Sequence, residues 1–140
     1  MKLWKKILIG ISTLILLCIG GLFLLIQSLP DMCGNQVLAE YPSPNNKLKA
    51  VTFERDCGAT TGFSTQVSIL SSASVLENEG GNIFVADTNH GAAPAGQGGG
   101  PEVQVNWLSE TRLQIQHHKL VRIHRAETKS ERVQVEYVTF

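Results

Sequence analysis

The most constraining feature of this chain is a run of 20 uncharged residues, residues 7–26, close to the N-terminus. As a single helix, the run extends about 30 Å, which is the thickness of the hydrocarbon core of a bilayer. A helix satisfies its own backbone hydrogen bonds, so a segment of this length and composition can cross a membrane. We therefore predict a transmembrane anchor over residues 7–26.

The charges on either side of the run predict its orientation. Three lysines lie in residues 1–6, and the first charged residue after the run is Asp31. Positive charges collect on the cytoplasmic side of membrane helices. We therefore expect residues 1–6 to be a cytoplasmic basic arm, and we expect residues 31–140 to lie outside the cytoplasm.

A cleaved signal peptide is the alternative interpretation of this segment. Its apolar region is shorter, about 7 to 15 residues, and a small-residue cleavage site follows closely. The sequence VLA at residues 37–39 has the required spacing of small residues, but it ends 13 residues after the run. The segment therefore fits a retained single-pass anchor in the inner membrane better.

Residues 31–140 are enough for one domain of ordinary size. They carry 9 Lys and Arg against 12 Asp and Glu, a net charge of −3. Proteins that bind nucleic acids usually have a basic face, so we expect no nucleic-acid partner. Prolines and asparagines mark residues 27–46, which we interpret as a stalk or linker before an extracytoplasmic β domain at residues 47–140.

Short β-type runs follow one another after residue 46, and no helical periodicity is present there. We predict one hairpin from residues 101–108 and 112–116 and a second from residues 120–125 and 132–140, with a turn at 117–119 and a loop at 72–79. The fold class expected is all-β, an antiparallel meander forming a small sandwich or open barrel after one transmembrane helix. The other predicted strands are residues 47–55, 64–70 and 81–86.

The three cysteines divide by their predicted location. Cys18 lies within the membrane run, where it acts as a small apolar residue. Cys33 and Cys57 lie in an oxidising compartment, and two thiols there most simply form a disulfide with each other. A reactive Cys57 is the alternative, but the neighbouring Asp56 carboxylate disfavours the thiolate that a nucleophile needs.

Two loops carry the most varied polar chemistry of the predicted domain. Residues 56–65, DCGATTGFST, are rich in hydroxyl groups, and residues 87–101 contain five glycines in 15 residues, more than a hairpin needs. Either the loops form a binding site, or they are a disulfide-pinned turn and a flexible connection. The candidate binding residues are Thr60, Thr61 and Ser64 in the first loop and Asp87, Asn89 and His90 in the second.

Several site types are not supported by the sequence. The glycine-rich loop lacks the GKS or GKT sequence of a phosphate loop, and its similarity to a calcium loop is incomplete. His117 and His118 are adjacent and would face opposite sides of a strand, so we expect surface histidines rather than a zinc site. We therefore expect no metal and no cofactor.

The segment DCGATTGFSTQVSIL resembles a group of small bacterial single-pass envelope proteins that have no established activity. This chain is similar to them in four features: a turn such as SPNNK, a GNIFVAD-like strand, a glycine-rich loop and a PEVQVNWLS-like hairpin. The resemblance spans roughly residues 42–115. It implies a membrane-tethered bacterial β domain and brings no substrate or catalytic residue.

The sequence favours a non-catalytic binding or interaction module in the bacterial envelope, with another envelope protein as a candidate partner. One alternative is a small hydrolase that uses His90 with hydroxyls of the DCGATTG loop. No nucleophile elbow supports this alternative. A further alternative is an accessory subunit of a membrane complex.

The predicted orientation can be tested with a fusion of alkaline phosphatase after Phe140. This enzyme folds only outside the cytoplasm, because it needs disulfides. We expect an active fusion and an uncleaved chain, since Lys2, Lys5 and Lys6 hold the N-terminus inside. An inactive alkaline phosphatase fusion combined with a fluorescent cytoplasmic reporter fusion would reverse the orientation.

Overall fold

The computed structural model describes residues 2–29 and 32–140. The chain divides into two compact units, Met1–Asp31 and Met32–Phe140. Met1 of the predicted arm, and Pro30 and Asp31 of the predicted stalk, lie outside the described residues.

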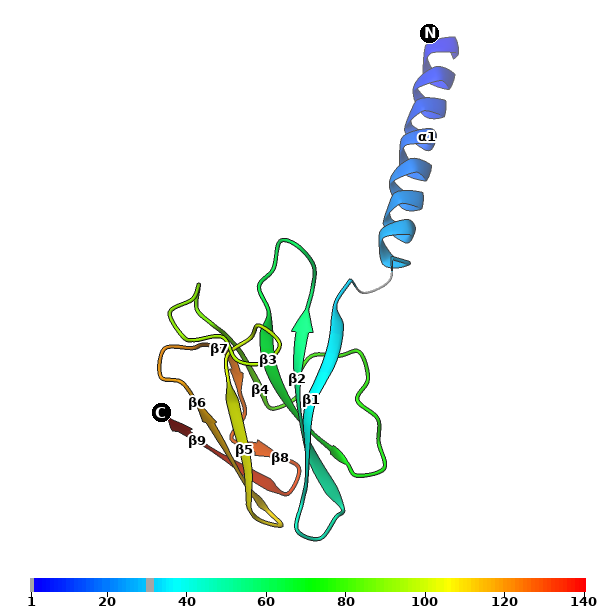
Figure 1. Ribbon diagram of the computed structural model, residues 1–140. Coiled ribbons are helices and arrows are strands. Elements are labelled where there is room, and N and C mark those ends of the chain that lie inside the picture. Colours follow the sequence, from blue (N-terminus) through cyan, green and yellow to red (C-terminus); the bar gives the residue numbers. More distant parts are fainter. Residues whose placement is uncertain (1, 30–31) are drawn as a thin grey trace. The chain divides into compact units, whose positions relative to one another are not determined.

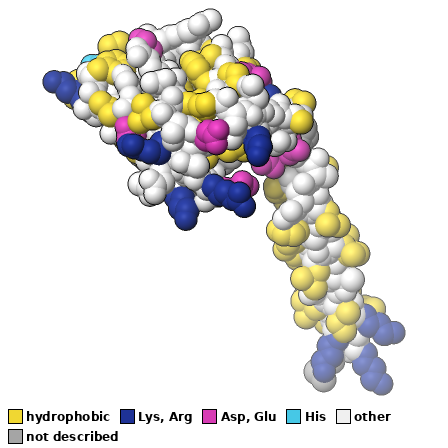
Figure 2. Space-filling view, turned by 90° about the horizontal axis from the view of Figure 1, so that it is seen from below, with side chains coloured by type: hydrophobic (Ala, Val, Ile, Leu, Met, Phe, Trp, Pro, Cys, Tyr) yellow, Lys and Arg dark blue, Asp and Glu magenta, His cyan; other side chains and the backbone are white. Residues whose placement is uncertain are grey.

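The first unit is one helix, α1 (Lys2–Gln27), which is long and apolar enough to cross a membrane. Its side chains are all exposed, and Figure 2 shows hydrophobic side chains around the helix with Lys and Arg side chains at its N-terminal end. Such a helix is stable only where lipid or another apolar surface covers it, so its composition suits a membrane anchor or a signal segment.

The second unit is a sandwich of two β-sheets (Figure 1). The predicted all-β class is confirmed, and no closed barrel forms. The first sheet is antiparallel with strand order β1-β2-β3-β4-β7, and the second has the order β5-β6-β9-β8, with β6 and β9 parallel. The strands are β1 (Gly34–Pro42), β2 (Leu48–Asp56), β3 (Ser64–Ser71), β4 (Phe84–Asp87), β5 (Val103–Ser109), β6 (Arg112–His117), β7 (Arg122–Ala126), β8 (Lys129–Ser130) and β9 (Val133–Thr139).

The core lies between the sheets and follows from alternation along the strands. Inward-facing side chains of β3 and β4 pack against those of β6 and β9. β6 is buried at every second position, and β9 is buried at Val133 and Val135. Phe84 is fully buried near the centre, with its ring stacked on His117 at 5.5 Å between centroids. The buried apolar core consists of Ala50, Val67, Ile69, Ile83, Phe84, Ala86, Val105, Leu113, Ile115, Val133 and Val135.

The prediction of a stalk over residues 27–46 is wrong for residues 34–42, because Gly34–Pro42 forms the edge strand β1. This strand pairs with β2 from Gly34 opposite Asp56 to Pro42 opposite Lys49. None of its residues is buried, so its side chains carry no apolar signal that alternation could reveal. The backbone ladder, together with the partly buried Tyr41 that packs against the core, holds this segment in the sheet.

The predicted hairpin of residues 120–125 with 132–140 is also wrong. β7 pairs with β4 in the first sheet, and β9 returns to the second sheet beside β6. Parallel strands in one sheet need a long connection, and the excursion through β7 supplies it. The hairpin of β5 with β6 is confirmed. A turn precedes β7, but it lies at residues 119–120 rather than at 117–119, since His117 is the last residue of β6.

A second buried cluster lies on the outer face of the first sheet. Val51 and Phe53 point away from the core but are fully buried. The segment between β3 and β4, residues 72–82, is tied to this face. Asn35 Nδ2 donates to the carbonyls of Glu77 and Glu79, at 3.1 Å and 2.7 Å. These bonds hold the loop on the outer face of the first sheet, the face on which Val51 and Phe53 are buried.

The end of that loop is fixed by side chains that replace strand pairing. The Asn82 side chain accepts from the Ile69 amide and donates to the Ile69 carbonyl, both at 2.9 Å. The amide of Gly81 donates to Gln66 Oε1 at 2.6 Å. A Cβ at Gly81 would lie 2.6 Å from the carbonyl oxygen of Phe84, so this position requires glycine.

The predicted disulfide between Cys33 and Cys57 is confirmed. It joins the start of β1 to the residue after β2, directly beyond the Gly34–Asp56 pair. The disulfide therefore does not restrain a stalk. It holds the start of the edge strand β1, none of whose residues is buried. Cys18 is exposed on α1.

We expect Cys57→Ser to lower the free energy of unfolding by about 3.5 kcal/mol, the chain-entropy value for a loop of this length. The melting temperature should fall by roughly 10 °C or more for a domain of this size. Thermal unfolding of the full chain in detergent micelles measures the change. Cys18→Ser is the matched control and should be neutral. Equal melting temperatures for the two variants would contradict the stabilising role of the bridge.

Candidate functional site

The two loops selected from the sequence meet at one cavity of about 540 Å³, which we name the loop groove. The loop after β2 forms one side, and the end of β4, the turn after it and β7 form the other. Five of the six predicted site residues line the groove, and Asn89 supports it from the turn. The lining residues are Thr60, Thr61, Gly62, Phe63, Ser64, Val85, Asp87, Thr88, His90, Arg122 and His124.

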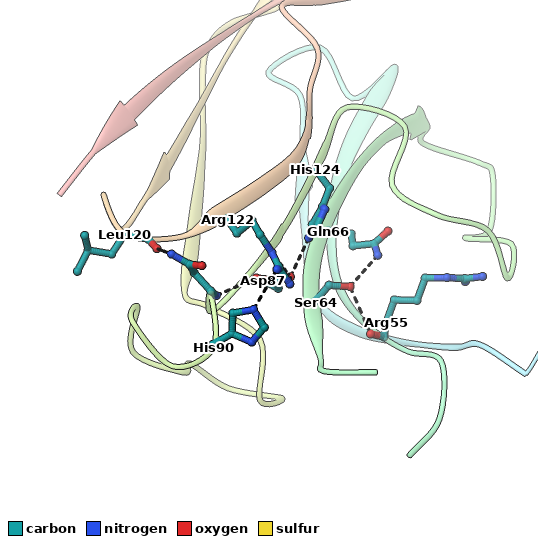
Figure 3. Close-up of polar contacts among 9 residues, drawn as sticks. Arg55, Ser64, Gln66, Asp87, His90, Leu120, Arg122 and His124 are labelled. Carbon is teal, nitrogen blue, oxygen red and sulfur yellow. Dashed lines mark hydrogen bonds and ion pairs between the residues drawn. The ribbon is translucent and has the colours of Figure 1, made fainter. Parts of the chain in front are cut away.

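Asp87, the last residue of β4, is the polar centre of the groove (Figure 3). It lies opposite Arg122 in the β4–β7 ladder. Its Oδ2 accepts hydrogen bonds from Arg122 Nε at 3.0 Å and Nη2 at 2.6 Å. The Asp87 side chain is 16% exposed and that of Arg122 is 47% exposed. The carboxylate is therefore shielded, while the guanidinium faces the solvent of the groove.

His124 reaches the same carboxylate because β7 contains a bulge. Ala86 pairs with Ile123 and Val85 pairs with Arg125, so His124 is the extra residue between them. Its Nε2 lies 2.7 Å from Asp87 Oδ2, and a carboxylate only accepts, so Nε2 carries the hydrogen.

The turn after β4 is held in an uncommon backbone conformation. Asn89, His90 and Gly91 have successive positive φ angles of 51°, 57° and 86°. Asparagine and glycine adopt this conformation readily, whereas histidine does so less often. The Asn89 amide donates to Asp87 Oδ1 at 2.8 Å, and Asn89 Nδ2 donates to the Leu120 carbonyl at 3.3 Å. These bonds hold the turn, and with it His90, against the residues that precede β7.

His90 contacts Arg122 rather than a hydroxyl. Its Nε2 lies 3.2 Å from Arg122 Nη1 (Figure 3). A guanidinium has donors only, so Nε2 must accept and the hydrogen of the neutral ring lies on Nδ1. Asp87, His90, Arg122 and His124 thus form one connected set, which we name the Asp87 cluster.

The Asp87 cluster holds its carboxylate in the ionised form. Burial alone would raise the pKa of Asp87, but hydrogen bonds from Arg122, His124 and the Asn89 amide outweigh burial. The result is a pKa lowered from 3.8 to about 2. Asp87 is therefore an anion at neutral pH, and its oxygens already accept four hydrogen bonds.

The hydroxyls of the first loop differ in their availability. Thr60 and Thr61 are exposed at the groove, and Thr61 Oγ1 donates to the Gly58 carbonyl at 3.0 Å. Ser64 is partly buried, where its Oγ accepts from Gln66 Nε2 at 2.8 Å and donates to the Arg55 carbonyl at 3.3 Å. Ser64 therefore fixes the start of β3.

Sequence reasoning missed Arg122, His124 and Phe63 as parts of this site. The predicted hairpin of residues 120–125 with 132–140 separated Arg122 and His124 from Asp87. Only the pairing of β7 with β4 brings them to Asp87. Phe63 is 45% exposed and adds an aromatic ring to the groove. No local sequence signal marks these three residues as neighbours.

The expectation of surface histidines fails for His117, which is 5% exposed in the core. Its ring stacks on Phe84, and its Nδ1 lies 3.1 Å from the His118 carbonyl oxygen. His117 is therefore a core residue with a partner for its ring nitrogen. Within residues 2–29 and 32–140, no three His, Cys, Asp or Glu side chains come together as a metal site would require.

The glycine-rich loop is packed against the sheet over its second half. The Thr65 hydroxyl donates to the Pro101 carbonyl at 2.6 Å, and Ala95 and Pro101 form a β-bridge. A Cβ at Gly100 would lie 2.7 Å from the Thr65 amide nitrogen. This part of the loop is therefore a fitted cover over β3, and shortening it would cost stability.

No family model, no curated protein and no solved structure matches this chain. The resemblance of residues 42–115 to bacterial envelope proteins therefore stays a prediction.

We expect Asp87→Asn to lower the free energy of unfolding by about 1–2 kcal/mol at pH 7. Because the folded-state pKa of Asp87 lies below its ordinary value, its contribution is present above about pH 4 and is lost as the pH falls towards 2. Urea unfolding at pH 7 and near pH 2 measures both values.

Glu40→Gln is the matched control for this prediction. Glu40 pairs with Lys49 at 3.1 Å, but its side chain is 48% exposed, so its loss should cost less. A pH-independent effect of Asp87→Asn, or an effect no larger than that of Glu40→Gln, would contradict the assigned role of the Asp87 cluster.

Proposed function

We propose that this protein is a membrane-anchored binding module of the bacterial envelope, with a cytoplasmic N-terminus and its β domain outside the inner membrane. The apolar α1 with its N-terminal lysines supports the anchor and its orientation. The Cys33–Cys57 disulfide supports an oxidising compartment for the domain.

The observation that carries the proposal is the convergence of two loops and β7 on the loop groove. Clefts with a few convergent polar groups and a group of perturbed pKa are the usual places of ligand sites. The groove combines all three features with an exposed aromatic ring, Phe63. Loops on a rigid β scaffold also commonly carry function.

The polar groups left free in the groove are mainly donors, which indicates the class of ligand. The only carboxylate in its lining, Asp87, is occupied by four hydrogen bonds. Of the five N–H groups of Arg122, two bond Asp87 and one bonds His90, so two remain. With the Thr60 hydroxyl and His90 Nδ1–H beside them, these donors suit an oxyanion.

The proposed ligand is therefore a group with a phosphate or carboxylate, held by Arg122. This mode differs from a phosphate loop, because the donors come from side chains rather than from the amides of the glycine-rich segment. Asp87 acts as a positioning residue, since it fixes the plane of the guanidinium. A guanidinium presents its remaining N–H groups in a fixed fork that matches an oxyanion.

The hydrolase alternative gains less support from this geometry. A nucleophilic hydroxyl should bond a neighbouring base, whereas the observed partner of His90 Nε2 is Arg122. Among the described residues, no hydrogen bond joins His90 to Thr60, Thr61 or Ser64. The third function, an accessory subunit of a membrane complex, has no observation of its own in this site.

Titration of the full chain in detergent micelles with inorganic phosphate and with acetate, at constant ionic strength, tests the proposal. We expect saturable binding that weakens about tenfold or more in Arg122→Gln, since a hydrogen bond to a charged group contributes roughly 1.5–3 kcal/mol. Calorimetry or amide chemical shifts measure the affinity.

Arg112→Gln is the matched control, because Arg112 also bonds a carboxylate, Glu136, at 2.8 Å, but lies in the second sheet. Its affinity for both anions should equal that of the original chain. Thr60→Val provides a second groove variant that leaves the Asp87 cluster intact and should also weaken binding. The oxyanion site would be refuted if Arg122→Gln and Thr60→Val bound each anion as tightly as the original chain does. It would also be refuted if neither anion bound saturably.

A further inference from the structure

Glu54 on β2 is a buried carboxyl group that the proposed function does not use. Its side chain points towards the inner side of the first sheet, and the residue is 7% exposed. Its Oε2 is buried and has no hydrogen-bond partner among the described residues. On ionisation this oxygen of the carboxylate has lost its water without replacement, which disfavours the charged form.

The glycine-rich loop forms the cover over this carboxyl group. Gly98 lies directly against Glu54, and a Cβ at Gly98 would collide with Glu54 Oε2. Gly98 also has a φ of 88°, so both its backbone and its contact require glycine. The cover is closed on itself by a hydrogen bond of 2.7 Å from the Gly96 amide to the Gly100 carbonyl.

No positive charge compensates Glu54 from the elements packed around it. Asp56 follows it on the same face of β2, while β3 and residues 91–101 carry no charged side chain. Glu40, the charged residue of β1, pairs opposite Val51 on the outer face. Burial, and secondarily the charge of Asp56, raise the pKa of Glu54 above its ordinary value of 4.5.

We propose that Glu54 and the segment of residues 96–101 form a proton-operated latch. With Glu54 protonated, the neutral carboxyl group tolerates the cover of Gly98 and the segment stays closed. Once the proton is lost, the carboxylate requires water, and the segment lifts from β2 to admit it.

The latch reaches the loop groove through one contact. A Cβ at Gly99 would lie 2.7 Å from Phe63 Cδ2, so the backbone of Gly99 rests on the Phe63 ring. Phe63 lines the groove from the first loop. Opening of the segment therefore removes the support of Phe63, which lines the groove. The location proposed above, outside the cytoplasm, exposes the domain to the external pH that would drive this opening.

Hydrogen exchange of the full chain in detergent micelles tests the latch, with rates corrected for the intrinsic pH dependence of exchange. Above pH 4.5, opening of residues 96–100 should become up to about tenfold more favourable per pH unit, until Glu54 is ionised in both forms. The protection of the Gly96 amide should fall accordingly. The Gly81 amide, bonded to Gln66 Oε1 at 2.6 Å, is the internal reference and should keep its protection.

Three variants separate the latch from ordinary loop motion. Glu54→Gln keeps the shape without the charge and should keep the segment closed at every pH, while Gly98→Ala should open it at every pH. Glu102→Gln removes an exposed neighbouring carboxylate and should leave the pH profile unchanged. A flat profile in the original chain, or the same sloping profile in Glu54→Gln, would overturn the proposal without affecting the oxyanion site.

Discussion

The pairing of β7 with β4 is the contact on which the rest of the domain depends. It moves a strand from the C-terminal third of the chain into the first sheet, and the return from that sheet places β9 parallel to β6. The same pairing sets Arg122 opposite Asp87, and its bulge adds His124. One ladder within the first sheet therefore sets the route of the C-terminal part of the chain and assembles the polar side of the loop groove.

Asp87 orders the side chains and the turn that line the loop groove. A carboxylate that accepts four hydrogen bonds has little capacity left for a ligand, but it fixes the groups that donate to it. The turn carrying His90, the plane of the Arg122 guanidinium and the His124 ring all share this one acceptor. A ligand in the groove would therefore meet hydrogen-bond donors, while the Asp87 carboxylate holds these donors in place.

The sequence predicts those parts of the fold that depend on local pattern. The apolar run of α1, the alternation of the core strands, the β5–β6 hairpin and the disulfide all follow from composition and spacing. Strand partners do not, because β7 and β9 alternate equally well in a hairpin or in separate sheets. β1 was not predicted as a strand, because its side chains are little buried on either face. The groove loops were identified by their polar residues, whereas Arg122 and His124 required knowledge of a long-range pairing.

The central claim, that Asp87 and Arg122 act as one unit across the β4–β7 ladder, is tested most directly by a double-mutant cycle. Asp87→Asn, Arg122→Gln and the double variant would be compared by urea unfolding of the full chain at neutral pH and low salt. Because the carboxylate is mostly shielded, the account predicts a coupling free energy of about 1 kcal/mol or more. Additive effects, within about 0.3 kcal/mol, would contradict it.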